Sequence, residues 1–228
     1  MAGRKPELDI VLIGGGGHAK VVSEAIFLEG TYSVRGFLDR NKSSGDILCE
    51  FGGHQVECLG SDEDESLLEL ATSVVICIGD NLTRRKIHQK LSKYHPHLSY
   101  PTILHPTAVV SAGTQIGRGT VVLAGVVINM CAEVGDFCVI NTSSSIDHDS
   151  LIRDYSFIGP GATLCGNVKI GEESFVGAGS VVLQGMEVGE KTLIGAATLI
   201  IRSVGAFQVI FGVPGRVQRS RSSSERYI

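Results

Sequence analysis

The most reactive pattern in the sequence is Asp147-His148-Asp149, in which one imidazole lies between two carboxylates. Histidine titrates near neutral pH, and neighbouring negative charges favour its protonated form, so His148 is suited to accept a proton as a general base. Asp149 is the better candidate to orient the ring, as the acid does in a catalytic triad, whereas Asp147 is then a turn residue. A lone histidine is more often structural, so the hypothesis depends on the elements that position this one.

The stretch around His148 follows a strict six-residue repeat, in which an aliphatic residue occupies every sixth position. Because side chains alternate along a strand, each unit predicts a short strand with the aliphatic side chain inside, followed by a corner. Three units make a triangular coil of eighteen residues. Ile146 occupies an inward position, and we expect His148, two positions later, to project outward. Glycine directly follows seven of the inward positions, and we expect it to supply backbone freedom at the corners. The inward positions are Leu104, Val110, Ile116, Val122, Ile128, Val134, Ile140, Ile146, Ile152, Ile158, Leu164, Ile170, Val176, Val182, Val188, Ile194 and Ile200.

Gly166 lies eighteen residues after His148, which is one full coil. We therefore expect it directly over the histidine, at about one strand spacing of 4.8 Å. A glycine there allows close approach of a reacting group and leaves an N–H free to bind an oxyanion. The alternative is an ordinary corner glycine.

Residues 8–100 alternate between apolar and amphipathic stretches. The pattern predicts strands at 8–13, 34–38, 54–59 and 74–78 and helices at 19–28, 62–71 and 81–93, which is typical of a small parallel, Rossmann-like sheet covered by helices. We divide the chain into an α/β domain (1–100), a repeat domain (101–216) and a polar, basic, flexible tail (217–228).

Four glycines at positions 14–17 follow the first predicted strand and open a helix, where backbone N–H groups bind phosphate. A dinucleotide site is the usual alternative, but the strand count is low and the repeat offers no place for hydride chemistry. Asp39, Gly79 and Asn81 follow other strands at the same sheet edge, where α/β sheets bind ligands. Asp39 could equally cap a turn.

Composition narrows the function classes. A net charge of −4 argues against a nucleic-acid surface. Six cysteines without a C-x-x-C pair, and no histidine pair at zinc spacing, predict reduced thiols and no metal site. The acidic run at 62–65 is more typical of a helix N-terminus than of a cation site. The chain has no apolar signal core and no apolar run that would span a membrane, so we expect a cytoplasmic protein.

Four stretches carry a family resemblance: residues 13–22 (IGGGGHAKVV), 78–86 (IGDNLTRRK), 141–149 (NTSSSIDHD) and 211–216 (FGVPGR). With the six-residue repeat, they make the chain resemble the left-handed parallel β-helix acyltransferases. The subgroup it resembles comprises the bacterial nucleotide-amino-sugar N-acetyltransferases of the bacillosamine and perosamine type, together with the sialic acid O-acetyltransferases. The resemblance implies an α/β N-terminal domain before a left-handed β-helix, a homotrimer with active sites between neighbouring β-helices, and acetyl-CoA as co-substrate.

The resemblance also implies roles for individual residues. It makes His148 the catalytic base and Gly166 the oxyanion donor. Phe157 is a departure, because some members of the family carry a second histidine there. Three further groups are implied: the glycine-rich loop with Gly16, Gly17 and His18 for the diphosphate and sugar; Asp39, Gly79, Asn81 and Asn141 for the rest of the nucleotide-sugar; and Gly166, Ala178, Gly179 and Ala196 for acetyl-CoA.

The leading hypothesis is an acetyl-CoA-dependent N-acetyltransferase. Its acceptor would be the amino group of a 4-amino-4,6-dideoxy or 3-amino sugar linked to UDP, dTDP or GDP. Two alternatives stay open at this point: a sugar O-acetyltransferase of the sialic acid type, and a non-catalytic β-helix protein that only binds a nucleotide.

Overall fold

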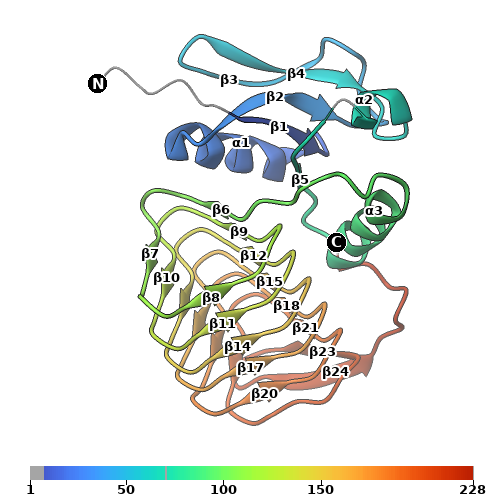
Figure 1. Cartoon of the computed structure of the whole chain (residues 1–228). Coiled ribbons are helices and arrows are strands. Elements are labelled where there is room, and N and C mark those ends of the chain that lie inside the picture. The colour runs from blue at the N-terminus through green and yellow to red at the C-terminus, as the bar shows by residue number, and fades with distance from the viewer. Residues whose placement is uncertain (1–7, 70, 228) are drawn as a thin grey trace.

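The computed structural model describes residues 8–69 and 71–227, which form a small α/β domain above a long β-helix (Figure 1). The α/β domain contains β1 (Leu8–Ile13), α1 (Gly17–Glu29), β2 (Tyr32–Leu38), β3 (Ile47–Phe51), β4 (His54–Gly60), α2 (Glu65–Glu69), β5 (Val74–Ile76) and α3 (Asn81–Tyr94). The β-helix contains β6 (Ile103–Leu104), β7 (Val109–Val110), β8 (Gln115–Ile116), β9 (Val121–Val122), β10 (Val127–Ile128), β11 (Glu133–Val134), β12 (Val139–Ile140), β13 (Ser145–Ile146), β14 (Leu151–Ile152), β15 (Phe157–Ile158), β16 (Thr163–Leu164), β17 (Lys169–Ile170), β18 (Phe175–Val176), β19 (Val181–Val182), β20 (Glu187–Val188), β21 (Leu193–Ile194), β22 (Leu199–Ile200), β23 (Gln208–Phe211) and β24 (Arg216–Ser220).

The N-terminal sheet has the strand order β3-β4-β2-β1-β5. Its pairs β1–β2, β1–β5 and β2–β4 are parallel, as the sequence predicts, but β3 and β4 form an antiparallel hairpin that we did not predict. The hairpin turns at Gly52 and Gly53, both with positive φ (56° and 84°), the backbone conformation that two-residue hairpin loops need. The Gly-Gly pair was therefore the signal that we missed.

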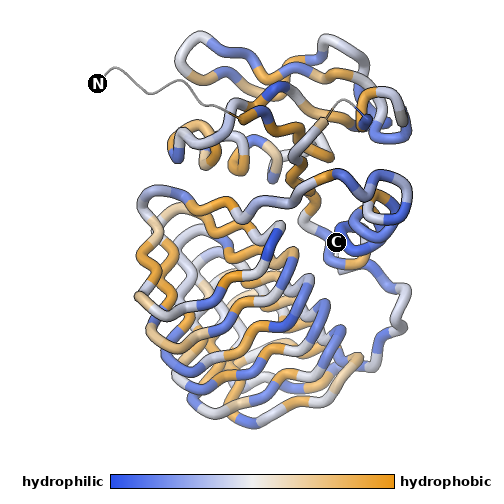
Figure 2. The backbone as a smooth tube through the Cα atoms, in the orientation of Figure 1, coloured by the Kyte–Doolittle hydropathy of each residue, from blue (hydrophilic) through white to orange (hydrophobic). Residues whose placement is uncertain are grey.

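The repeat winds into a left-handed β-helix whose successive strands stack into three sheets. Strands are paired in parallel with partners eighteen residues apart, for example Ser145 with Thr163 and Ile146 with Leu164, which confirms the triangular coil. The inward aliphatic side chains form one continuous core, in which Ile146 and Ile170 are fully buried. Burying such a side chain contributes about 1.5–3 kcal/mol. Hydrophobic and hydrophilic segments accordingly alternate around each coil (Figure 2).

Each corner of the triangle lies between two sheets, and we name the corners by one residue. The Ala178 corner follows the strands of the eight-stranded sheet, which runs from β6 to β24. The His148 corner follows those of the six-stranded sheet, from β7 to β22, and the Glu173 corner follows those of the five-stranded sheet, from β8 to β20. Every coil contributes one position to each corner.

The glycines that follow inward positions have a different role from the one expected. The left-handed residue of most corners lies two positions later, as at Asp149 (φ 58°) and Glu173 (φ 55°). A Cβ on Gly171 would instead lie 2.4 Å from the backbone N of Glu190, and one on Gly177 would lie 2.5 Å from that of Ala196. These glycines are thus needed for the close approach of successive coils rather than for an unusual backbone angle.

The α/β domain is attached to the Glu173 corner through α3. Arg84 of this helix is 1% exposed. Its Nε donates to the carbonyl of Phe137 (2.8 Å), and its Nη2 donates to the carbonyl of Tyr155 (2.8 Å). Its Nη1 donates to the carbonyls of Ile78 and Gly79 (2.8 and 3.0 Å). One buried guanidinium thus bridges the two domains.

The prediction of a flexible tail at 217–228 is wrong for its described part. Residues 216–220 form β24, which pairs antiparallel with β23, and residues 221–227 then run back up the β-helix to α3 (Figure 1). The polar composition suggested disorder. The sequence could not show the contacts that hold this segment, because they are made with residues far away in sequence. Residue 228 and residues 1–7 lie outside the described residues.

Candidate active site

His148 projects outward from its corner, as the repeat predicts, and its side chain is 53% exposed. Its Nδ1 lies 2.7 Å from Oδ2 of Asp149. The hydrogen bond that the protonated Nδ1 donates to Asp149, followed by the negative charge of Asp147, raises the pKa of His148 above its ordinary value of 6.5. The left-handed backbone of Asp149 brings its carboxylate alongside the preceding ring.

Asp147 faces a different set of partners. Its Oδ1 accepts a hydrogen bond from Nδ2 of Asn129 at 2.7 Å and another from the backbone N–H of His148 at 2.8 Å. The first of these bonds is the main reason that the pKa of Asp147 is lowered. Asp149 therefore contacts the imidazole directly, whereas Asp147 acts on it through charge alone.

Gly166 lies against the imidazole, in the next coil. A Cβ on Gly166 would be 2.6 Å from Nε2 and 2.7 Å from Cε1 of His148, so only glycine fits beneath the ring. Within the described residues, the N–H of Gly166 donates to no protein acceptor. Since Asp149 occupies Nδ1, Nε2 is the ring nitrogen left for a substrate, and it lies against Gly166, which is itself buried under the ring.

Asn141 and the three small residues chosen for acetyl-CoA lie on another corner. Ala178 and Ala196 are exposed and stack in successive coils of the Ala178 corner, and Gly179 beside them has φ 65°. Asn141 begins the same corner two coils earlier, directly after β12, and its Oδ1 accepts a hydrogen bond from the N–H of Thr142 (2.8 Å). Asn141 does not have the positive φ of a left-handed corner, so corner geometry does not explain the choice of asparagine here.

The glycine-rich loop keeps its helix N-terminus open. Gly16 precedes α1 without a side-chain cap, and the first turn of α1 has no acidic residue. Gly16 and Gly17 are exposed, and a Cβ on either would meet nothing within 4 Å. The first N–H groups of α1 are thus accessible, and the helix dipole adds a partial positive charge there.

Asp39 and His18 flank this loop. Asp39 accepts hydrogen bonds from the N–H of Gly15 (Oδ2, 2.8 Å) and from the N–H of Asn41 (Oδ1, 2.9 Å), so it holds the loop and caps a turn. Nε2 of His18 is buried without a partner among the described residues. Burial, together with the charge of Arg84, lowers the pKa of His18 to about 4, so the ring is neutral at pH 7.

Asn81 differs from the expectation that it contacts the nucleotide-sugar. It is fully buried, and its Nδ2 donates to the carbonyls of Glu173 (3.2 Å) and Ser174 (3.0 Å). Its Oδ1 accepts from Arg84 at 2.7 Å. All of its polar atoms are therefore used within the domain junction, whereas Gly79 stays partly exposed beside it. The position of Asn81 after a strand could not show that its side chain points into the junction between the two domains.

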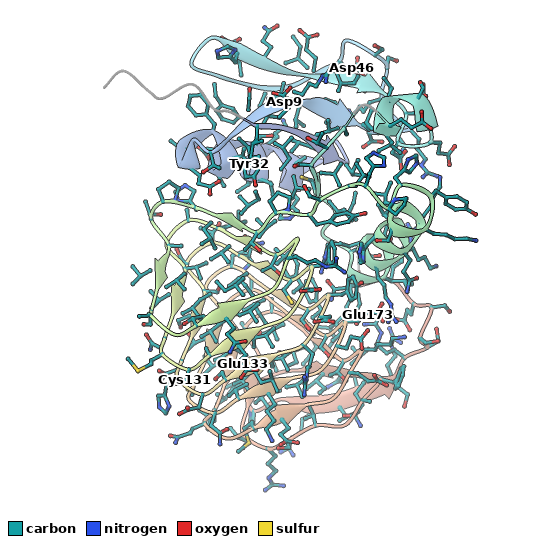
Figure 3. All side chains as sticks on the ribbon, viewed as in Figure 1. Asp9, Tyr32, Asp46, Cys131, Glu133 and Glu173 are labelled. Atoms are coloured by element: carbon teal, nitrogen blue, oxygen red, sulfur yellow. The ribbon has the colours of Figure 1, made fainter. Side chains whose placement is uncertain are left out.

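The predicted residues thus lie on three different corners of one chain. His148 and Gly166 share the His148 corner, Ala178 and Ala196 share the next, and the α/β domain with its glycine-rich loop is attached to the third. Figure 3 shows this separation: Cys131, which belongs to the His148 corner, and Glu173 lie on opposite sides of the β-helix. No group of three or more metal-ligating side chains occurs in the described part of the chain. Among the helices of residues 8–69 and 71–227, none is long and apolar enough to cross a membrane.

Comparison with known families places this architecture among the hexapeptide transferases. The PglD N-terminal domain family matches residues 9–91, and the bacterial transferase hexapeptide family, with six repeats, matches residues 149–184. The acetyltransferase domain of PglB from Neisseria gonorrhoeae FA1090, solved with acetyl coenzyme A, is 31% identical. It has a TM-score of 0.82, and the match covers 92% of this chain and 98% of that one.

A second solved structure extends the similarity to a complex with a nucleotide-sugar. PerB from Caulobacter crescentus, solved with CoA and GDP-perosamine, is 32% identical with a TM-score of 0.83, and the match covers 92% of this chain and 97% of that one. UDP-N-acetylbacillosamine N-acetyltransferase of Bacillus subtilis is 31% identical over 119 residues, which span 51% of each protein. The chain belongs to the hexapeptide-repeat sugar N-acetyltransferases with a PglD-type N-terminal domain. The match reaches about half the length of the Bacillus relative and nearly all of both solved chains.

Proposed function

We propose that the protein transfers the acetyl group of acetyl-CoA to the amino group of a sugar carried by a nucleoside diphosphate, with His148 as general base. One observation carries the proposal: Asp149 holds Nδ1 of His148, which leaves Nε2 beside Gly166, whose N–H donates to no acceptor among the described residues. A proton acceptor and a candidate oxyanion donor, the two groups that acyl transfer needs, thus belong to neighbouring residues of one corner.

The chemistry follows from these two groups. The acceptor nitrogen attacks the thioester carbonyl carbon, and Nε2 of His148 takes the proton that the nitrogen loses as the C–N bond forms. Asp149 stabilises the resulting imidazolium. The N–H of Gly166 binds the oxyanion of the tetrahedral intermediate. When the C–S bond breaks, the imidazolium returns the proton to the sulfur of CoA. General base catalysis of this kind is worth about 10²–10⁴-fold, and one oxyanion donor about 10²–10³-fold.

The α/β domain supplies the acceptor site in this proposal. The open N–H groups of Gly16 and Gly17 are suited to a diphosphate, and the neutral ring of His18 beside them has a buried Nε2 without a partner among the described residues. Two relatives support this class of acceptor, because their names and complexes contain UDP-N-acetylbacillosamine and GDP-perosamine. Small residues at Ala178 and Ala196 leave room for the extended arm of acetyl-CoA along their corner.

We further propose a homotrimer, because one chain separates the three sub-sites. The outward face of the six-stranded sheet supports association, since Val109 is 60% exposed and Val127 is 37% exposed, while Leu183 and Ile201 at its edge are also exposed. In a threefold assembly, the His148 corner of one chain can face the Ala178 corner of the next, so that the site uses both.

Thiol release from acetyl-CoA in the presence of UDP-, dTDP- and GDP-linked 4-amino-4,6-dideoxy sugars tests the activity. We expect release with an amine acceptor, no release with the matching 4-hydroxy sugar, and loss of about 10²-fold or more in kcat/KM for His148→Ala. The control is His54→Ala, an exposed histidine in the β3–β4 hairpin. Full activity of His148→Ala would reject the base, and release with hydroxyl acceptors would indicate an O-acetyltransferase.

Subunit mixing tests the shared site. His148→Ala and Gly17→Glu are each expected to be inactive, the second because a carboxylate would repel the diphosphate. Co-expressed at equal levels, they should recover about a quarter of the wild-type activity if each site combines His148 of one chain with the glycine-rich loop of another, and none if both belong to the same chain. A solution mass three times that of the 24.2 kDa chain would support the trimer independently.

A further inference from the structure

The segment 221–227 connects the last coils to the α/β domain through contacts that the proposed reaction does not use. Its first residue, Arg221, donates its backbone N–H to the carbonyl of Phe207 (2.8 Å), and its guanidinium carbon lies 3.7 Å from the centre of the Tyr227 ring. Tyr227 stacks on Phe175 with ring centres 5.5 Å apart. Only 7% of Arg221 is exposed and Tyr227 is partly buried, so the two ends of the segment are packed, whereas residues 222–224 and 226 between them are exposed.

Tyr227 ends this path at one side-chain group and one backbone group of the domain junction. Its N–H donates to Oδ2 of Asp80 at 3.0 Å, and its hydroxyl donates to the carbonyl of Glu173. Burial raises the pKa of the Tyr227 hydroxyl above its ordinary value of 10, so the group keeps its proton and remains a donor at physiological pH. The same Glu173 carbonyl accepts from Asn81, at the start of α3.

Asp80 makes this contact relevant to the acceptor site. Its Oδ1 caps α3 by accepting from the backbone N–H of Thr83 (2.8 Å) and from the Thr83 hydroxyl (2.5 Å). Its Oδ2 is left for Tyr227. Asp80 follows Gly79, in the loop after β5 that borders the same sheet edge as the glycine-rich loop. The segment therefore holds a residue of this loop from the side of the β-helix.

We propose that residues 221–227 act as a strap that positions the loop of Gly79 and Asp80, with Tyr227 as a positioning residue for the acceptor nucleotide-sugar. The inference rests on the proposed function of this sheet edge. Arg84 already ties the domains together by its bonds to Phe137 and Tyr155, so attachment does not depend on the strap. What the strap adds is a fixed orientation of Asp80, and this should affect acceptor binding rather than acetyl transfer itself.

Steady-state kinetics of the full-length protein separate positioning from general stabilisation. Deletion of the residues after Ser220 should raise KM for the amino-sugar acceptor about tenfold, which corresponds to the loss of one hydrogen bond to a charged group. KM for acetyl-CoA and kcat should stay within about twofold, since His148 and Gly166 lie on another corner. Equal loss in both KM values, or no change in either, would overturn the proposal. Gln218→Ala, an exposed change in β24, is the control and should match wild type.

The substitution Tyr227→Phe provides a second test that does not depend on the folding of the deletion variant. This variant keeps the ring on Phe175 and the N–H to Asp80 and loses only the hydroxyl bond to Glu173, so its KM for the acceptor should rise less than in the deletion. An unchanged KM in Tyr227→Phe together with a tenfold rise in Tyr227→Ala would place the effect in the ring, which also supports the strap. Wild-type KM in both would overturn it.

Amide hydrogen exchange tests the strap without relying on enzymatic activity. Deleting the strap should speed exchange in residues 79–84 about tenfold, while the N–H groups of residues 139–152, around His148, keep their wild-type rates. If wild type acetylates no member of the sugar panel, the proposed function fails, yet faster exchange at 79–84 would still support the strap. Unchanged exchange would overturn the strap even in an active enzyme.

Discussion

Gly166→Ala gives the sharpest test of the stacked site, because it adds one methyl group at a known place. The new Cβ would lie 2.6 Å from Nε2 of His148, and the ring would have to move away by about 0.8 Å to restore an ordinary contact of 3.4 Å. The His148 side chain is 53% exposed and free to move, so the fold should tolerate the change. The N–H of residue 166 is retained, and the oxyanion donor is thus still present.

The size of the effect follows from this displacement. A shift of about 1 Å in a catalytic group can cost about 10²-fold in rate, so we expect kcat/KM to fall by about that factor. The melting temperature should change by no more than about 2 °C, because the methyl group meets a surface side chain rather than the core. Thiol release from acetyl-CoA measures the first quantity, and thermal unfolding followed by circular dichroism measures the second.

Gly205→Ala is the matched control for this substitution. Gly205 has no positive φ, and its Cβ would meet only Gln208 at 3.4 Å, an ordinary contact, so activity and stability should stay at wild-type values. If Gly166→Ala kept kcat/KM within about threefold of wild type, His148 would not need its place over Gly166, and the reasoning would be refuted. A large loss of stability in Gly166→Ala would instead show that the ring is held more rigidly than its exposure indicates.

Three further substitutions test the electrostatics and the packing. Asp149→Asn removes the main cause of the raised pKa of His148; that pKa should fall toward 6.5, and the acidic limb of the kcat/KM–pH profile should move to lower pH, whereas an unmoved limb would argue against Asp149 as the orienting residue. Ile170→Ala should lower the free energy of unfolding by about 2–5 kcal/mol in urea, against about 0.5 kcal/mol or less for its outward neighbour Lys169→Ala, and equal effects would contradict the inward assignment. Arg84→Met leaves buried carbonyls unpaired and should cost about 2–4 kcal/mol in the same assay, while wild-type stability would show that these bonds are dispensable.

The β-helix could be predicted in detail because its rules are local. An aliphatic residue such as Ile146 recurs at a fixed spacing, and this spacing fixes the coil length and places His148 at a corner, beyond the end of the inward-facing strand. The position of Gly166 over the ring follows from the same count and was confirmed by the structure. The glycines after inward positions were misread, since a local argument assigns glycine to unusual backbone angles, whereas here the constraint comes from the neighbouring coil.

Contacts between distant parts of the chain could not be predicted from the sequence. Asn81 looked like a ligand contact because it follows a strand, but its partners are carbonyls of Glu173 and Ser174, about ninety residues away, in the repeat. The position of residues 221–227 has the same origin, since Tyr227 contacts Asp80, 147 residues away in sequence. Polar composition predicts solvation, and it carries no information about a partner supplied by another domain.

The register of the repeat is itself a constraint on the chemistry. His148 and Gly166 belong to different coils, and only the eighteen-residue spacing places the backbone of Gly166 beside Nε2 of His148. A single residue inserted between them would turn Gly166 away from this corner and place the side chain of Cys165 or a neighbour against the ring. Insertions elsewhere on the coils would disturb only packing. The unbroken repeat from residue 104 to residue 200 is therefore what a catalytic pair built from two successive turns requires.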